Sequence, residues 1–428
     1  MAYDRWDRYY IWLHKQPLFL WQIMLSFKIF GISEFSLRIP NIILGTAVVI
    51  ATYRSGKLIA NKNVGYIASV LTITSIYILE LIAGRQELEH NDLTFLAYIS
   101  LSIWSFIEYY YSKNKIWIYL IGLFSGMAIL CKWVVGLLVY FGWFVLRISQ
   151  KKIRLAENKD FITALTITII VALPWQILTF WWYPTEAISA YKFNTEHFTI
   201  PLDGHDGDFW YHLNIFNTIY GKVASFLVIP GFLVLYKNNK DRALLNSMLS
   251  MVIVVYIFFS SAATKMPSFT IVVAMIIIIA LSALLYYVID CINQYLKNDI
   301  LKHISFAIAI IIVVLIRFDL SYLADKYTLK NEDNRYTKML THNKELFNSL
   351  DLPSNAVLFN VKGRHYIEAM FYTDLPAYNF TPSLEQYHEL KDKGRTIALF
   401  VKQNEDIPDF IKNDPSTIFI HKKIMGYE

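Results

Sequence analysis

Ionisable residues gather near the ends of several long apolar segments in the first three quarters of this sequence. Charge at membrane depth costs free energy, so such residues often mark a binding site or a reaction path. The candidates are His14, Lys15, Arg85, Asp92, Lys132, Glu196, His197, His205 and Lys265. Cations bind phosphate esters, and carboxylate or imidazole groups can take a proton from a hydroxyl. This inventory suits transfer from a phosphate-linked donor to a hydroxyl acceptor.

Each of these residues also has a structural explanation when it is taken alone. Lys132 and Lys265 could extend toward the membrane surface, and Asp92 could cap the helix that follows it. His205 could do no more than bind a loop carbonyl. The functional interpretation therefore depends on their number on one side of a chain that otherwise carries little charge.

Composition predicts a membrane protein. Of the 428 residues, 55% are apolar and 17% are charged, whereas a soluble domain carries about 25% charged residues. We expect a mainly α, polytopic helical bundle with about ten spans, because a bilayer core about 30 Å thick needs roughly 20 apolar residues as helix. The expected spans are 37–53, 64–83, 92–110, 116–130, 134–148, 161–181, 215–236, 243–260, 268–288 and 301–317.

The stretch 116–148 is too long for one span and carries Lys132 at its centre. We expect two short helices that meet in a tight turn at the membrane surface, because a lysine buried in a single long helix would cost about 3 kcal/mol or more. With this hairpin, the strongly basic loops all lie on one side, which is then cytoplasmic. The candidate residues and the acidic loop 182–214 lie on the other side. The chain is thus expected in the inner (plasma) membrane as a multi-pass protein with its site outside the cytoplasm.

Two further parts differ from the spans. The segment near 17–30 is apolar but short, which is typical of an interfacial or re-entrant helix. We expect the membrane domain to cover 1–320 and an extracytoplasmic α/β domain to cover 321–428. Its strands are predicted at Ala356–Val361, Thr396–Val401 and Thr417–Ile420, with helices between them.

Composition also excludes several kinds of partner and site. Cys131 and Cys291 lie too far apart to suggest a disulfide framework or a metal knuckle. The basic residues occur in short clusters between apolar runs, so no nucleic acid is expected. Met1–Arg8 is polar and carries no signal peptide. No cofactor can be identified, and a divalent cation is left open.

Six short motifs resemble one family. His14-Lys15-Gln16-Pro17-Leu18-Phe19-Leu20-Trp21 is similar to the "D/E-K-P-P-L-x-x-W" signature of the GT-C glycosyltransferases of family 39, which include aminoarabinose transferase-like and protein O-mannosyltransferase-like enzymes. Five more motifs follow in the family's order over about 3–290: Gly126 to Leu137, Pro174-Trp175, Glu196-His197-Phe198, Gly204 to Gly207 and Lys265-Met266-Pro267.

The resemblance implies a GT-C-like bundle that binds a polyprenyl-phosphate-linked sugar as donor and membrane lipid around it. It implies transfer with inversion to an extracytoplasmic glycolipid, polysaccharide or protein. Asp92 and His197 would then be catalytic, and the donor phosphate would lie at Lys15. The other substrate-binding candidates are His14, Arg85, Lys132, Glu196, His205, Lys265 and Phe269.

The sequence also departs from the family pattern. His14 stands where the family has an acid, Gln16 where it has proline, and Phe269 where it prefers tyrosine. The family's first span and first acidic motif would lie before Met1, so we expect an N-terminally truncated chain in which Asp4 or Asp7 could replace the catalytic base. A flippase or exporter of lipid-linked saccharide, or a catalytically incomplete homologue, is the alternative function.

Overall fold

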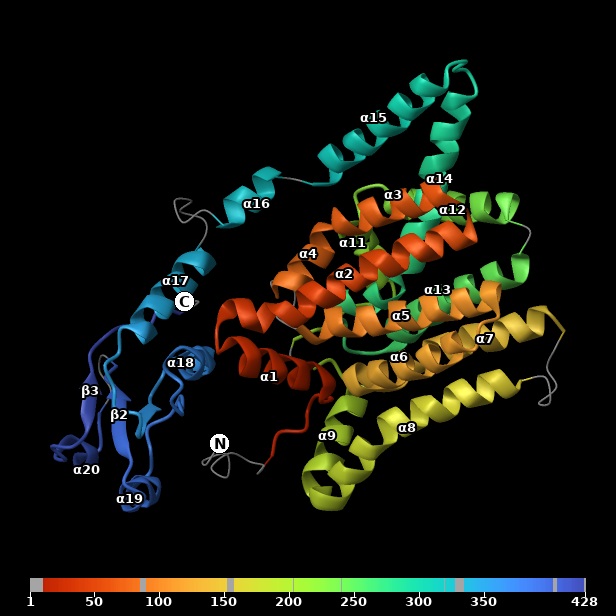
Figure 1. The fold of residues 1–428 in the computed structure, drawn as a ribbon. Coiled ribbons are helices and arrows are strands. Elements are labelled where there is room, and N and C mark those ends of the chain that lie inside the picture. Colours follow the sequence, from red (N-terminus) through yellow and green to blue (C-terminus); the bar gives the residue numbers. More distant parts are fainter. Residues whose placement is uncertain are drawn as a thin grey trace. The chain divides into compact units, whose positions relative to one another are not determined.

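The computed structural model describes residues 11–84, 90–151, 158–202, 204–239, 241–318, 320–327, 335–402 and 406–426. These residues form two compact units (Figure 1). The larger, helical unit ends at Phe318, and the smaller unit follows it.

The larger unit is built almost entirely of helices, as the composition predicts. They are α1 Leu18–Phe30, α2 Glu34–Ile59, α3 Lys62–Ile73, α4 Ile76–Ala83, α5 His90–Ser112, α6 Ile116–Lys132, α7 Leu138–Ser149, α8 Lys159–Trp182, α9 Pro184–Glu196, α10 Tyr211–Asn214, α11 Phe216–Tyr220, α12 Ala224–Asn238, α13 Arg242–Ser261, α14 Ala274–Asn293 and α15 Asp299–Arg317. Two 3-10 turns, η2 Trp133–Leu137 and η4 Pro267–Val273, interrupt this order.

Six helical runs among the described residues are long and apolar enough to cross a membrane, or up to eight if two bent helix pairs each count as one span. This confirms a multi-pass membrane protein, while the count of ten stays a prediction. The expected span 64–83 is bent by 52° between α3 and α4. The expected span 215–236 is broken after Tyr220, where the chain bends by 83° before α12.

The chain reverses between α6 and α7, as expected from Lys132. A Cβ added to Gly136 would lie 2.6 Å from the nitrogen of Ile129, so η2 packs back on α6. Further along, the Tyr140 hydroxyl lies 2.6 Å from Thr168 Oγ1, which donates to the Gly122 carbonyl at 3.0 Å. As the chain advances from Gly136 to Tyr140, its neighbours on α6 change from Ile129 to Gly122, the latter through Thr168. The two helices therefore run antiparallel and form a hairpin. Ile116–Ser149 is one of the six apolar runs given above, because η2 joins α6 and α7 without a break in helical structure. This run therefore contains both helices of the hairpin.

Two glycines of α6 let α8 pack very close to it. A Cβ at Gly122 would lie 2.6 Å from the Ala164 carbonyl oxygen, and one at Gly126 would lie 2.6 Å from the Val171 side chain. Glycines spaced four residues apart on one helix face allow such close approach between helices in a membrane. The hairpin is thus held firmly against α8.

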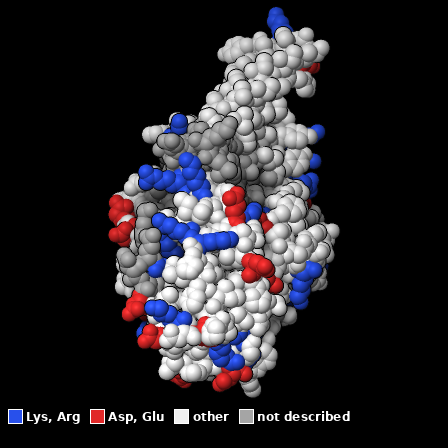
Figure 2. Space-filling view, turned by 90° about the vertical axis from the view of Figure 1, so that its left-hand side faces the viewer, with Lys and Arg blue, Asp and Glu red and all other residues white. Residues whose placement is uncertain are grey.

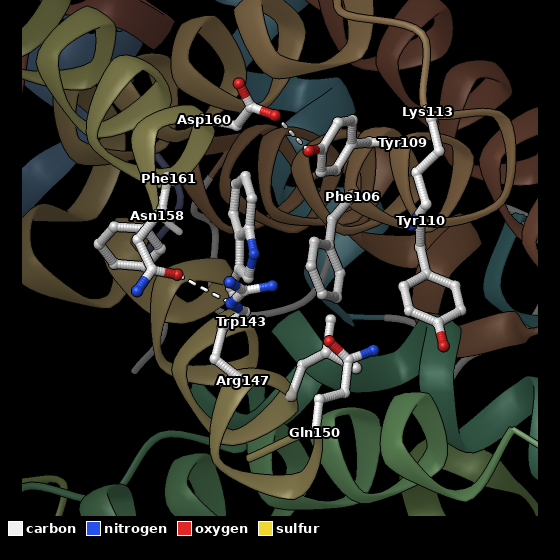
Figure 3. Close-up of a pocket in the computed structure, with 11 residues that line it drawn as sticks. Phe106, Tyr109, Tyr110, Lys113, Trp143, Arg147, Gln150, Asn158, Asp160 and Phe161 are labelled. Atoms are coloured by element: carbon white, nitrogen blue, oxygen red, sulfur yellow. Dashed lines mark hydrogen bonds between the residues drawn. The ribbon is translucent and has the colours of Figure 1, made fainter. Parts of the chain in front are cut away.

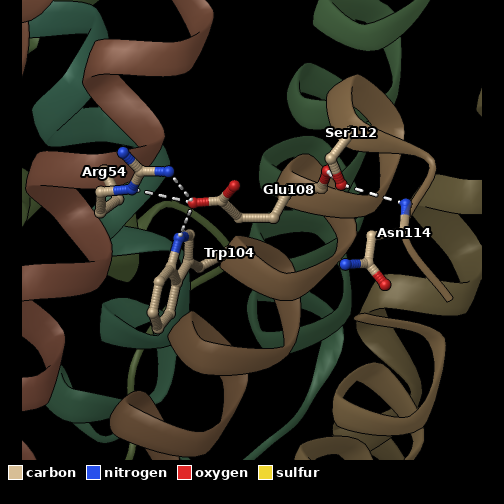
Figure 4. A network of polar contacts seen from close by, with 5 residues as sticks. All are labelled: Arg54, Trp104, Glu108, Ser112 and Asn114. Atoms are coloured by element: carbon tan, nitrogen blue, oxygen red, sulfur yellow. Dashed lines mark hydrogen bonds and ion pairs between the residues drawn. The ribbon is translucent and has the colours of Figure 1, made fainter. Parts of the chain in front are cut away.

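An ion pair with a buried carboxylate and a partly exposed arginine ties α2 to α5 at the end of the bundle away from the start of α5 (Figure 4). Arg54 donates to Glu108 Oε1 through Nε at 2.9 Å and through Nη2 at 2.6 Å, and Trp104 Nε1 donates to the same oxygen at 3.1 Å. One turn later, Ser112 Oγ donates to the Glu108 carbonyl and accepts from the Asn114 nitrogen.

Helix α15 exposes a long apolar face. Ile304, Ile308 and Ile312 are each about half exposed. In the upper part of Figure 2, where α14 and α15 lie in Figure 1, charged side chains are found mainly near the tip. Such a surface suits contact with lipid.

The smaller unit contains a three-stranded parallel sheet in the order β1-β2-β3. Its elements are α16 Leu320–Tyr327, α17 Arg335–Asn348, β1 Ala356–Phe359, η5 Gly363–His365, α18 Tyr366–Thr373, α19 Leu384–Asp392, β2 Thr396–Phe400, α20 Asp409–Lys412 and β3 Ile418–Ile420. All three strands lie inside the segments predicted as strands. Alternate strand residues pack into separate apolar clusters on the two faces, with Leu358 in one and Val357 in the other.

Candidate functional site

Six of the predicted residues lie at one end of the larger unit: His14, Asp92, Lys132, His197, Lys265 and Phe269. They come from the segment before α1, the start of α5, the end of α6, the end of α9, and the turn between α13 and α14. Arg85, Asp4 and Asp7 lie outside the described residues.

Asp92 and Lys132 form an ion pair at the centre of this group. Asp92 is in the first turn of α5 and its side chain is only 2% exposed, whereas that of Lys132 is 19% exposed. The second carboxylate oxygen of Asp92, Oδ2, is buried without a hydrogen-bond partner among the described residues. Asn91 Nδ2 donates to the Cys131 carbonyl at 3.1 Å and so holds the same two helix ends together.

Lys132 also contacts the turn that begins α14. Its Nζ lies 5.1 Å from the centre of the Phe269 ring, which is the range of a cation–π contact. The ring of Phe269 in turn packs 4.9 Å from that of Phe259. Phe269, where the family pattern prefers tyrosine, thus faces the lysine.

The segment before α1 lies against α9. The His14 ring is 5.1 Å from the Phe193 ring, which is 5.5 Å from the His197 ring. Asn194 Nδ2 donates to the His14 carbonyl at 3.2 Å. His14 Nδ1 is buried and has no hydrogen-bond partner among the described residues. His14 and His197, which are far apart in the sequence, therefore lie on two sides of Phe193.

Thr264 orients His197. Its Oγ1 lies 3.0 Å from His197 Nδ1 and accepts from the Leu202 nitrogen at 3.1 Å. Two backbone hydrogen bonds join the same segments. The Thr264 nitrogen donates to the His197 carbonyl, and the Lys265 nitrogen donates to the His205 carbonyl, both at 2.9 Å. The loop after α9 is thus fixed to the turn before η4.

A series of polar and aromatic contacts connects the Asp92–Lys132 pair with the segment that contains His14. Gln176 Nε2 donates to Gln16 Oε1 at 2.7 Å and accepts from the Tyr191 hydroxyl through its own oxygen. The Tyr191 ring lies 4.0 Å from that of Trp133, which follows Lys132 directly. The motif that contains His14 and the end of α6 are therefore connected through α8 and α9.

Lys265 has a contact that the sequence did not predict. Its side chain is buried, and Nζ donates to the carbonyls of Phe259, Ser260 and Ala262 at 3.3, 2.6 and 2.5 Å. These are last-turn carbonyls of α13, which lack partners within the helix. Burial lowers the pKa of Lys265, and Asp208 opposes that shift. Since an ammonium has three donors, contact of Lys265 with a ligand phosphate would require a change at this helix end.

Lys15, Glu196 and His205 are partly exposed beside these contacts. Lys15 follows His14, Glu196 precedes His197, and His205 is paired with Lys265 through the backbone. Their roles as substrate contacts stay predictions.

Sequence reasoning missed the residues that position the predicted ones, namely Phe193, Thr264, Gln176 and Tyr191. It also missed His212, which is fully buried, with its ring centre 6.3 Å from Phe259 and 6.5 Å from Phe269. A histidine inside an aromatic-rich apolar stretch is a detectable signal, since polar groups at membrane depth are costly. Gln176, a polar residue inside the apolar run of α8, carries a similar signal, whereas Thr264 carries none because threonine is common in turns.

The described residues contain no group of three or more His, Cys, Asp or Glu side chains that could hold a metal ion. A divalent cation therefore stays an untested expectation. The observed groups can instead supply positive charge through Lys132 and a proton acceptor through Asp92 or a histidine.

The fold is similar to that of known membrane transferases. Crystal structures of ArnT from Cupriavidus metallidurans match with TM-scores of 0.65 in the apo state and 0.66 with undecaprenyl phosphate bound. Identity is 12% and 13%, over 92% and 95% of this chain and 76% and 79% of ArnT. The oligosaccharyltransferase AglB from Archaeoglobus fulgidus, in complex with an inhibitory peptide and a dolichol-phosphate, matches with a TM-score of 0.52 and 12% identity over 85% of this chain and 56% of AglB.

Sequence comparisons agree with the fold over part of the chain. Residues 14–178 match the family model described as "Dolichyl-phosphate-mannose-protein mannosyltransferase". An uncharacterized protein of Aquifex aeolicus (strain VF5) is 25% identical over 177 residues, which is 40% of this chain and 32% of that relative. This match thus spans about a third of the relative's length. The family-model match over residues 14–178 includes His14, Asp92 and Lys132.

Proposed function

We propose that this chain transfers a sugar from a polyprenyl-phosphate-linked donor to an acceptor outside the cytoplasm. The similarity of its fold to ArnT and the family-model match over residues 14–178 support this proposal. The acceptor belongs to the glycolipids, polysaccharides or proteins, and the sugar carbon is inverted. The N-terminal expectation that Asp4 or Asp7 replaces a missing base concerns residues outside those described.

The observation that carries the proposal is the Asp92–Lys132 ion pair. It puts a carboxylate oxygen without a hydrogen-bond partner among the described residues next to a partly exposed cation, at the end of the bundle where His14 and His197 flank Phe193. Paired burial of one acid and one cation is expensive in a membrane, so a bundle held together by apolar contacts alone would not require it. A reaction at an anionic headgroup explains it.

The bound ligands of the structural relatives support the donor class. ArnT was crystallised with undecaprenyl phosphate and AglB with a dolichol-phosphate, both of which are polyprenyl-type phosphates. The cations of this site can interact with the negative charge of such a phosphate. They are Lys132, which lies over the Phe269 ring, and Lys15, which lies in the motif before α1.

The proposed step needs one base and positive charge. Asp92 Oδ2 takes the proton of the acceptor hydroxyl. At the same time, the oxygen of that hydroxyl attacks the anomeric carbon of the donor sugar. The bond from this carbon to the phosphate oxygen breaks, and the polyprenyl phosphate leaves with its electron pair. Lys132 and Lys15 stabilise the charge that develops on the leaving phosphate. Attack opposite the leaving group inverts the carbon.

The test uses the full chain in lipid nanodiscs with radiolabelled polyprenyl-phosphate sugars and a membrane extract as the source of acceptor. We expect label to pass from the polyprenyl fraction to a second product, and Lys15→Met to reduce this transfer. Failure to bind polyprenyl phosphate would refute the proposal. Donor crossing the membrane of sealed vesicles without any transfer would favour a flippase, and binding without transfer would favour a catalytically incomplete homologue.

A further inference from the structure

A polar cavity lies at the opposite end of the larger unit from Asp92, and Figure 3 shows it from close by. It is bounded by the last turns of α5, by α7 and by the start of α8, and it measures about 70 Å³. The lining residues are Phe106, Tyr109, Tyr110, Lys113, Trp143, Leu146, Arg147, Gln150, Asn158, Asp160 and Phe161. The proposed transfer reaction uses none of them.

Polar groups from three helices meet in this cavity. Arg147 Nε donates to Asn158 Oδ1 at 2.8 Å, and the Tyr109 hydroxyl donates to Asp160 Oδ2 at 2.5 Å (Figure 3). Lys113 Nζ lies 4.6 Å from the centre of the Tyr110 ring. With two cations, Lys113 and Arg147, and one carboxylate, Asp160, the lining carries a net charge of +1.

Aromatic rings form the walls of the cavity. The Trp143 ring is 5.5 Å from Phe106 and 5.4 Å from Phe161. These walls limit water around Arg147, which is partly buried, and so strengthen its attraction for an anion. A volume of about 70 Å³ is roughly twice the share of one water in the liquid, about 30 Å³, which suits a compact group such as one phosphate and is too small for a sugar ring with its phosphate.

The surface next to the cavity is apolar. Phe144 and Ile148 on α7 and Ile162 on α8 are 51%, 44% and 46% exposed. In a membrane, such side chains face lipid chains. A phosphate in this cavity can therefore belong to a lipid whose acyl chains lie along α7 and α8.

We propose that this cavity binds the phosphate of an anionic glycerophospholipid in the leaflet opposite the transfer site. Arg147 and Lys113 contact the phosphate, and the glycerol hydroxyls of the headgroup donate to Asp160 and Asn158. Basic pockets between membrane helices are known to bind anionic headgroups in this way. The net charge of +1 favours a phosphatidylglycerol-type headgroup over the zwitterionic phosphatidylethanolamine.

The proposal is tested by native mass spectrometry of the full chain released from nanodiscs made with equal amounts of phosphatidylglycerol and phosphatidylethanolamine. We expect retained phosphatidylglycerol, with Arg147→Gln and Lys113→Gln each weakening its binding about fivefold or more. Lys159→Gln is the matched control, because Lys159 is exposed at the same end of α8, makes the same charge change and does not line the cavity.

Three results would overturn the proposal. They are equal retention of the two lipids, the same effect from Lys159→Gln as from Arg147→Gln, and complete displacement of the lipid by glycerol phosphate, which would identify a soluble phosphate as the ligand. If Arg147→Gln does not fold, Arg147→Lys keeps the charge and should retain most of the lipid, and loss of the lipid in that folded variant would count against a phosphate contact. Because binding is measured without any donor sugar, the outcome is independent of the transfer reaction.

Discussion

Asp92 and Lys132, forty positions apart in the sequence, form an ion pair between the first turn of α5 and the last residue of α6. A carboxylate at a helix N-terminus and an ammonium at a helix C-terminus each interact favourably with the helix dipole. The pair is therefore stabilised by both helices, and the hairpin after Lys132 keeps it at the end of the bundle. The same geometry leaves Oδ2 of Asp92 buried without a hydrogen-bond partner among the described residues.

The Asp92→Asn variant tests this use of the pair. Asparagine keeps the shape of the side chain but cannot take a proton, so we expect sugar transfer to fall by about 100-fold or more while polyprenyl phosphate still binds. Asp299→Asn, at an exposed side chain near the start of α15, is the control and should transfer normally. Transfer within about threefold of the parent in folded Asp92→Asn would show that another group is the base.

Thr264 is expected to act through His197. Thr264→Val removes the hydroxyl that lies against His197 Nδ1, accepts from the Leu202 nitrogen and donates to the Ile200 carbonyl, so the histidine loses its fixed orientation. We expect kcat to fall about tenfold, since one lost hydrogen bond of roughly 1–1.5 kcal/mol corresponds to such a factor. Thr264→Ser keeps the hydroxyl and should restore transfer. Equal activity of the valine and serine variants would exclude a positioning role.

The hairpin was predictable because a lysine in the middle of an apolar stretch has few places to lie in a membrane. The structure turns the chain directly after Lys132, at Trp133, whose φ is 59°. The three short strands were predictable for a similar reason, since Val357, Ile397 and Phe419 lie in compact apolar runs bounded by polar turns.

Side-chain partners were much harder to predict. Lys265 was expected to contact the substrate, but in the structure its ammonium group donates to carbonyls at the end of α13. The backbone path of the turn before Lys265 determines where the ammonium group lies, and the sequence pattern does not reveal that path. The break after Tyr220 was missed because hydropathy averaged over 215–236 stays apolar, although Gly221 and Lys222 interrupt the run at the break itself. The pairing of Thr264 with His197 depends on long-range packing that no local pattern encodes.

The ion pair of Arg54 and Glu108 should matter for stability and not for transfer. Glu108→Gln removes the charge that Arg54 and Trp104 both contact, at a side chain that is 7% exposed. Because Arg54 itself is 36% exposed and can regain water, we expect a loss on the order of 1–3 kcal/mol, seen as a lower thermal unfolding temperature in one detergent. Trp104→Phe should cost less, and an unchanged unfolding temperature in Glu108→Gln would contradict this role.

Asp414 should make the stability of the smaller unit depend on pH. Contacts from Lys391, Ser416 and Tyr387 hold the pKa of Asp414 well below its ordinary value. Lys391 Nζ lies 2.6 Å from Oδ2, and the Ser416 nitrogen donates to Oδ1 at 2.8 Å. These contacts join α19 to the chain entering β3, so they should slow the opening of that strand.

The sign of the effect follows from the lowered pKa. The unfolded chain protonates Asp414 near pH 3.9 and the folded chain only at lower pH, so the stabilisation is complete above about pH 5 and is lost as pH falls below 4. Asp414→Asn should therefore speed hydrogen exchange of the β3 amides at pH 7, by a loss on the order of 1–2 kcal/mol, and have a smaller effect at pH 3, where part of this stabilisation is already lost. Asp392→Asn, at an exposed position of α19, should change neither. An equal effect of Asp414→Asn at both pH values would show that shape, and not charge, accounts for its contribution.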